Sequence, residues 1–326
     1  MGRAIFFLVT AAIVIAMKTI ATFLNSGDGA TISYAGPGFV REGCQWDANN
    51  ERFLVSRFEG GISELVKTDL GYEQRLVVDL EGDFKGNSTL GIRVDPPRNR
   101  LLAVVADAWN QKRAALIAYD LATWETLFVT NLESPGDLLL ADDVAVDPEG
   151  NAYVTEALGN FIWKIDRDGN NVANLSSPVF TSKPHQLPFY LAGLNGIDYH
   201  PDGFLLAIHT WSGALFKVSL DGSSVEVVKA PLVAGGDGIA LLSPDKLVVA
   251  GVPGARLLKS SDGWKSARLT HTYVGPFYRV PSAVTIKDGK AFVSHMFSWW
   301  NTFTIKEAIF APVRPKGSSA SRAAEL

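Results

Sequence analysis

The chain has 326 residues, of which 47% are hydrophobic and 20% charged, and its net charge is −4 at pH 7. This length fits one or two domains with a large apolar core, and a mild negative charge without a basic cluster argues against nucleic acid as a partner. The single cysteine, Cys44, excludes an internal disulfide and CxxC-type zinc or redox motifs, and we expect it to be a small buried apolar residue.

Residues 1–26 are predicted to be a signal peptide or a signal anchor. Arg3 precedes an apolar run from Ala4 to Met17, and "TIATFL" extends this run beyond Lys18. The short run favours a cleaved signal peptide, whereas residues 4–24 together are long enough for an uncleaved membrane anchor. Both alternatives predict the secretory pathway, with an extracellular, vacuolar or ER-lumenal location, and a membrane contact only through this segment.

Two glycosylation sequons, at Asn87 and Asn174, are compatible with a secreted glycoprotein.

Six segments with a common pattern follow along the chain. Two of them are "DDVAVDPEGNAYVTE" from Asp142 and "NGIDYHPDGFLLAIH" from Asn195. In each segment a small or polar residue opens a short strand, and a turn, often with Asp-Pro or Pro-Asp near a glycine, leads to a second apolar strand. A third strand follows, such as "FIWKIDRDG", and a fourth closes most units. In the third unit this fourth strand, near "NVANLS", has the weakest pattern.

Four short antiparallel strands that recur six times predict an all-β fold, a six-bladed β-propeller of four-stranded blades over residues 30–311. The sixth unit ends after its third strand, "TFTIKEAIF". We therefore expect the strand "ATISYA" near residue 30 to be the outer strand of the last blade, which would close the ring and remove two exposed edges. Residues 312–326 are small and polar and are predicted to form a flexible tail.

The residues that open the six first strands should meet at one end of the propeller axis, since first strands are innermost. In repeat register they are Glu42, Leu90, Asp142, Asn195, Asp237 and Ser282. Asp143 falls in the register that Gly43, Gly91, Gly196 and Gly238 occupy, which makes Asp142 the axial residue.

Three crowded carboxylates would repel each other unless a cation compensates their charge. An all-oxygen set with one amide suits Ca²⁺ better than Mg²⁺, and nothing resembles a zinc site. The predicted ligands are Glu42, Asp142, Asn195 and Asp237. The alternative is that these residues only start turns.

These motifs carry a resemblance to a known family: "EG" at Glu42, "DDVAVDPEGNAYVT" from Asp142, "NGIDYHPDG" from Asn195 and the "GDG" that ends at Gly238. The six-unit region resembles the senescence marker protein/gluconolactonase-like propellers of the calcium-dependent phosphotriesterase superfamily, akin to paraoxonase, diisopropyl fluorophosphatase and strictosidine-synthase-like proteins. The resemblance implies a catalytic calcium held by Glu, Asn, Asn and Asp at these four positions. The chain departs from it at Asp142, whose extra charge should keep the ion bound but weaken its Lewis acidity.

The resemblance implies a calcium-dependent hydrolase of a lactone or ester, with Asp237 as a base or nucleophile. No G-x-S-x-G motif supports serine catalysis. If the first strands run away from the site, the second strands return to it and bring His209 and His295 to its rim. Either histidine would serve as a general base or, alternatively, as a hydrogen-bonded structural residue.

We expect Trp211, Trp299 and Trp300 at the same rim, with His185 in the long loop that overhangs it. This composition favours a small apolar or aromatic ester or lactone as substrate. A non-catalytic, calcium-stabilised propeller that binds a ligand or protein is the alternative. A strictosidine-synthase-like condensing enzyme is weaker, because no acidic residue that would hold an amine is located.

Overall fold

The computed structural model describes residues 29–69, 71–136, 138–181, 193–275, 280–298 and 300–313. The predictions for residues 1–26, His185 and Trp299 lie outside this part of the chain. Within it the only helices are three short 3₁₀ turns, Gly82–Phe84, Pro96–Arg98 and Pro178–Thr181. None of the described segments is a helix with the length and apolarity needed to cross a bilayer.

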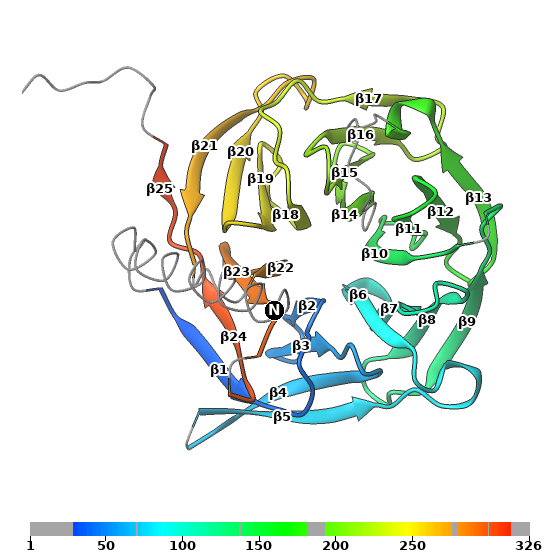
Figure 1. The fold of residues 1–326 in the computed structure, drawn as a ribbon, viewed down its shortest axis with the longest axis vertical. Helices are drawn as coiled ribbons and strands as arrows, with labels where there is room; N and C mark the ends of the chain where they lie inside the picture. The colour runs from blue at the N-terminus through cyan, green and yellow to red at the C-terminus, as the bar shows by residue number, and fades with distance from the viewer. Residues whose placement is uncertain are drawn as a thin grey trace, which may run out of the picture.

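The strands form five sheets that stand around a common axis, the arrangement of a β-propeller (Figure 1). The largest sheet contains, in spatial order, β2 (Cys44–Asp47), β3 (Arg52–Ser56), β4 (Ile62–Thr68), β5 (Gly71–Val78), β1 (Thr31–Ala35), β24 (Thr302–Glu307), β23 (Lys290–His295) and β22 (Pro281–Lys287). The next contains β6 (Ser88–Asp95), β7 (Arg100–Ala106), β8 (Ala114–Asp120) and β9 (Thr126–Leu132).

The remaining three sheets follow the same order from the axis outward. One contains β10 (Ala141–Val146), β11 (Ala152–Glu156), β12 (Phe161–Ile165) and β13 (Asn171–Ser176). Another contains β14 (Leu194–His200), β15 (Phe204–His209), β16 (Leu215–Ser219) and β17 (Val225–Val227). The last contains β18 (Gly236–Ser243), β19 (Lys246–Gly251), β20 (Ala255–Lys259), β21 (Arg268–Tyr273) and β25 (Ala311–Pro312).

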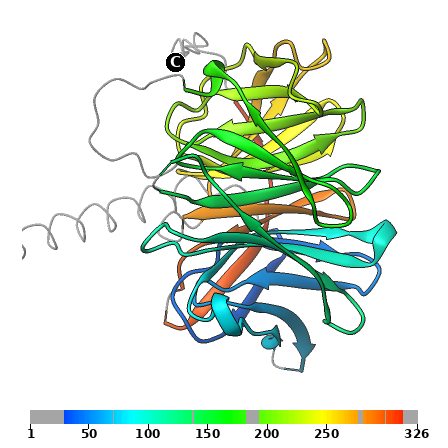
Figure 2. The same ribbon diagram turned by 90° about the vertical axis from the view of Figure 1, so that its right-hand side faces the viewer.

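The first strand of each repeat lies nearest the axis. These first strands are β2, β6, β10, β14, β18 and β22, and each packs against the next around the ring, with β22 packing against β2. Figure 2 shows the same sheets from the side, stacked around the axis. We call the end of the ring at which the first strands begin the site end.

The N-terminal strand β1 pairs with both ends of the repeat. It runs antiparallel to β24, from Thr31 opposite Lys306 to Ala35 opposite Thr302. Its last residues also pair in parallel with β5, which belongs to the first repeat unit. At the other terminus, Pro312, which the sequence places in the tail, pairs with His271 of β21.

Among the described residues, the core consists of six clusters of buried apolar side chains, each between two neighbouring layers of strands. Strand β7 shows why: its side chains alternate between the two faces of its sheet. Leu101, Ala103 and Val105 enter one cluster. Leu102 and Val104 enter the next. Because both faces are covered, inner strands read as continuous apolar runs, and the outer strands alternate with exposed residues.

Candidate metal and catalytic site

The four predicted ligands line one small cavity at the site end. This axial cavity is lined by Glu42, Gly43, Gly91, Asp142, Asp143, Asn195, Asp237, Gly238, Ser282 and Ala283. Of the six residues that open the first strands, Leu90 does not line it, and its neighbour Gly91 does. The cavity leaves about 20 Å³ for the centre of a water-sized molecule. That is room for one water or one ion.

The glycines next to the axial residues allow the first strands to approach each other closely. A Cβ atom at Gly196 would lie 2.3 Å from the carbonyl oxygen of Asp237, and one at Gly238 would lie 2.6 Å from that of Ser282. Neighbouring strands could not approach so closely if a larger residue stood there. This spacing brings side chains from different repeats to one point on the axis.

Asp143 occupies the same register without being a glycine. Its carboxylate accepts hydrogen bonds from the backbone N–H of Val144 at 2.8 Å and of Ile197, on the next first strand, at 3.3 Å. The side chain therefore bridges β10 and β14 and also lines the axial cavity. Both acids of the Asp142–Asp143 pair thus contribute charge to this cavity.

The carboxyl groups of the cavity raise each other's pKa. Burial, followed by the charges of Asp237 and Asp142, raises the pKa of Glu42 well above its usual value. Burial and the charge of Asp237 do the same to the pKa of Asp142. Burial raises the pKa of Asp237 to about 7, with the charge of Asp143 as the second cause. Without a compensating cation, part of this group holds protons near neutral pH.

The donor set fits a hard cation in its chemistry. Carboxylate and amide oxygens are the ligands that Ca²⁺ prefers. The Oδ1 atom of Asp237 is buried and, within the part of the chain that the structure describes, has no hydrogen-bond partner. Among the same residues, no group of three or more His, Cys, Asp or Glu side chains is already arranged to hold a metal. Coordination would therefore require these side chains to turn toward a common point.

The two predicted histidines lie at the site end, one strand outward from the axis. His209 pairs with Leu194, directly before Asn195. His295 pairs with Pro281, directly before Ser282. Both are buried, and neither lines the axial cavity.

Hydrogen bonds assign different tautomers to the two imidazoles. Nδ1 of His209 accepts from the Ser212 N–H at 3.2 Å, so the proton of the neutral ring lies on Nε2. Burial lowers the pKa of His209, which keeps it neutral. Nδ1 of His295 contacts the Thr304 carbonyl at 3.1 Å, where only a donor fits, so Nε2 of the neutral ring is an acceptor. That atom borders Gly275, where a Cβ would lie 3.0 Å from it.

The sequence did not single out Glu156, which stands in the register of the two histidines. It ends β11 and pairs with Ala141, directly before Asp142. It is fully buried, and its carboxylate accepts hydrogen bonds from the N–H groups of Leu140, at 2.8 Å, and of Gly159. Burial raises the pKa of Glu156 to about 7. Comparing the last residue of each second strand would have found it.

Large apolar side chains are exposed in the loops of the site end. Trp300 and Trp109 are 88% and 79% exposed, and Phe39 is 62% exposed. Phe39 contacts the ring of Phe297, and Trp109 that of Phe58. Trp211 is only half-buried. These side chains give the site end an apolar rim.

No family model matches the sequence, and no curated protein matches it. Solved structures do match its fold. The major allergen Mala s 1 of Malassezia sympodialis is 19% identical, with a TM-score of 0.67 over 87% of this chain and 97% of that chain. A gluconolactonase of Xanthomonas campestris is 15% identical, with a TM-score of 0.59 over 89% and 92%. A virginiamycin B lyase of Staphylococcus aureus is 13% identical, with a TM-score of 0.58 over 89% of each chain. At these identities the likeness shows a propeller fold.

Proposed function

We propose that the protein is a calcium-dependent hydrolase of a lactone or ester, with its site in the axial cavity. The observation that carries this proposal is the meeting of four carboxylates and one amide, from four different repeat units, in a cavity the size of one ion. The similarity in fold to a gluconolactonase supports it.

We also propose that the eight-stranded sheet is two four-stranded blades, so that the ring has six. On this count β1 is the outer strand of the last blade and its pairing with β24 closes the ring. Each of the four ligands then comes from a different blade. The order of the strands from the axis outward supports this count.

Glu42, Asp142, Asn195 and Asp237 would hold the ion. A bound Ca²⁺ supplies a Lewis acid that polarises the carbonyl of the substrate. The chain's own contribution is to place these oxygens. Ser282, the sixth residue in the axial register, donates a hydrogen bond to the carbonyl oxygen of Glu42 at 3.0 Å and so holds the backbone that carries this ligand.

Asp237 and His209 would move protons in the reaction. Asp237 Oδ1 has a raised pKa and no other partner among the described residues, so it would take a proton from the attacking water. His209, neutral and protonated on Nε2, would donate a hydrogen bond toward the leaving group. His295, with Nε2 as an acceptor, is the alternative base.

The exposed rim favours an apolar or aromatic leaving group over a free sugar acid. Trp109, Trp300 and Phe39 expose aromatic surface in the loops at the site end. Buried apolar area of this kind contributes to binding roughly in proportion to the area removed from water, about 25 cal/mol per Å². The substrate class is therefore a small ester or lactone with a hydrophobic part.

The decisive experiment is a panel of lactones and aryl esters assayed with calcium and with chelator. We expect turnover that the chelator abolishes and calcium restores. Asp237→Asn keeps the shape of the side chain and removes its basicity, so it should lower kcat by about 100-fold or more. Asp288→Asn, a matched change in an exposed turn residue, should leave kcat unchanged.

A non-catalytic, calcium-stabilised binding propeller is the second candidate. Its specific support is that no histidine of the described residues lines the axial cavity and that Asp142 adds a carboxylate to it. In this case the panel shows no turnover, and Asp237→Asn lowers only the thermal stabilisation that calcium provides.

A further inference from the structure

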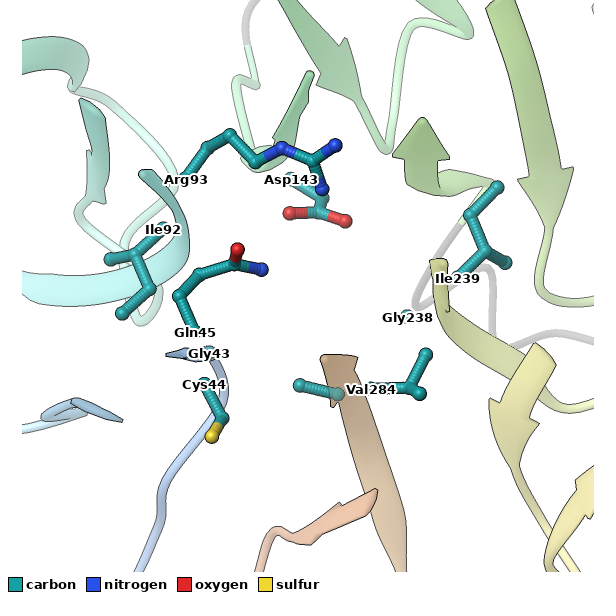
Figure 3. Close-up of a pocket in the computed structure, with 10 residues that line it drawn as sticks. Gly43, Cys44, Gln45, Ile92, Arg93, Asp143, Gly238, Ile239 and Val284 are labelled. Carbon is teal, nitrogen blue, oxygen red and sulfur yellow. The ribbon is translucent and has the colours of Figure 1, made fainter. Parts of the chain in front are cut away.

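A second cavity lies next to the axial cavity, further along the first strands and away from the site end. It too leaves about 20 Å³ for the centre of a water-sized molecule. Its lining, drawn in Figure 3, is Gly43, Cys44, Gln45, Ile92, Arg93, Asp143, Gly238, Ile239, Ala283 and Val284. Asp143 lines both cavities, so the two are adjacent along the axis.

Arg93 extends across the inside of the ring at this level. Its guanidinium forms an ion pair with Asp198, although Arg93 lies on β6 and Asp198 on β14, two repeats further on. Figure 3 shows the same guanidinium beside the Asp143 carboxylate, with the Gln45 amide pointing into the same space.

Asp198 is held firmly in place to receive this charge. Its side chain is 5% exposed. Besides Arg93, it accepts the N–H groups of Tyr199 at 2.9 Å and of Leu241, on β18, at 2.8 Å. Four neighbouring first strands, β6, β10, β14 and β18, are thus joined through Arg93, Asp143 and Asp198.

The two cavities differ in their balance of charge. Glu42, Asp142, Asp143 and Asp237 line the axial cavity, and no basic side chain is among the described residues of its lining. The second cavity has Arg93 facing Asp143 and paired with Asp198. The Arg93 guanidinium brings a positive charge to this cavity. A further divalent cation here would lie beside it and be repelled.

We infer that the Arg93 guanidinium takes the place of a metal cation in the second cavity. It thereby limits the protein to one divalent cation, bound at the axial cavity. This inference rests on the calcium site of the proposed function. Removing the guanidinium leaves Asp143, Asp198 and the Gln45 amide around the vacated volume, an oxygen set that suits a second Ca²⁺.

Calcium stoichiometry tests the role of Arg93. The metal-free full chain is titrated with Ca²⁺ by calorimetry, and bound calcium is counted by elemental analysis after desalting. We expect one ion per wild-type chain and one per Arg93→Lys chain, which keeps the charge. Arg93→Gln removes the charge and keeps most of the side chain, and it should bind two. Arg93→Met is the second variant in case Arg93→Gln does not fold.

The possible counts separate the two proposals. Two ions in the wild type, or one ion in a folded Arg93→Gln or Arg93→Met chain, would overturn the role of Arg93 and leave the axial calcium site standing. No ion in the wild type would refute the calcium site of the proposed function, and the inference with it. The wild-type count needs no variant, so the test holds even where both substitutions prevent folding.

Discussion

At the scale of single residues, the adjacent acids Asp142 and Asp143 have different roles. Asp142 points its charge into the axial cavity, and Asp143 lines both cavities while accepting the N–H of Ile197 on the neighbouring strand. The glycines that occupy the Asp143 register in other repeats only allow neighbouring first strands to approach each other closely. The carboxylate adds a hydrogen-bonded link between them and a partner for the charge of Arg93.

The titration of the buried acids predicts how stability depends on pH. The pKa values of Asp237 and Glu156 are both raised to about 7, mainly by burial. In the unfolded chain such groups ionise near pH 4. Between about pH 4 and pH 7, the metal-free folded protein holds protons that the unfolded chain has released. Its free energy of unfolding should therefore fall as pH rises through this window.

Thermal melts of the metal-free protein at about pH 5 and about pH 8 measure this effect. We expect a lower Tm at the higher pH, and a larger rise of Tm on adding Ca²⁺ there, because protons no longer compete for the carboxylates. Asp237→Asn is the control and should flatten the dependence. A Tm that rises from pH 5 to pH 8 without metal would contradict the raised pKa values of these buried acids.

At the scale of elements, the register of first and second strands determines what surrounds the site. Four second strands, β11, β15, β19 and β23, end opposite the residue just before an axial position. This register brings Glu156, His209 and His295 to equivalent places. The direction of the strands alone predicts this for the histidines. Glu156 was overlooked because a glutamate at the end of a strand has no motif around it.

At the end of the ring opposite the site end, arginine side chains form ion pairs within their own sheet and hydrogen bonds to the next repeat. Arg100 is 4% exposed, pairs with Asp95 at 2.8 Å, and donates to the carbonyl oxygens of Arg167 and Gly150, both at 2.7 Å. The first contact lies within its own sheet, and the other two reach the next repeat. Arg52 makes similar contacts, with Asp47, Glu64 and the Leu121 carbonyl.

We expect Arg100→Met to lower the free energy of unfolding by about 2–3 kcal/mol. It removes the Arg100 partner of the buried Asp95 carboxylate, which keeps Arg98 at 3.2 Å, and it removes the donor to two carbonyl oxygens. Urea denaturation measures the change. The double variant Arg100→Met, Asp95→Leu should recover part of the loss, since it removes both charges. Arg167→Ala, in an ion pair exposed to 68% and 72%, is the control and should change stability by less than about 1 kcal/mol. Equal losses of stability in Arg100→Met and Arg167→Ala would show that the buried contacts of Arg100 do not stabilise the fold more than an exposed ion pair does.

At the scale of the whole molecule, one short strand connects the two ends of the chain's repeat. β1 pairs with β24 on one side and β5 on the other. Its inward side chains, Ile32 and Tyr34, are 7% and 2% exposed and pack among residues of the first and last units. Glu42, a proposed ligand, follows this strand by only a few residues, so we expect the pairing of β1 to affect the shape of the site.

Removing β1 should therefore destabilise the protein and weaken its site. A chain that starts at Gly36 loses the burial of Ile32 and Tyr34, at about 1.5–3 kcal/mol each, together with both strand pairings. A chain that starts at Gly29 retains β1 and is the matched control. Urea denaturation and calcium titration of both chains provide the measurements. Unchanged stability and calcium affinity in the shorter chain would show that β1 does not hold the ring together.

The sequence by itself determined the all-β repeat, the residues that open the first strands and the side of the ring to which the histidines return. These features follow from local period and turn chemistry, which repeat along the chain. Even the outer strand of the third unit, whose pattern is weak, forms as β13. Only the tertiary structure decided that Asp143 lines two cavities, that Glu156 lies beside the axial acids, and that Arg93 pairs with Asp198. The Arg93 and Asp143 contacts join side chains to residues of other repeats, and no local pattern encodes how far a side chain reaches around the axis.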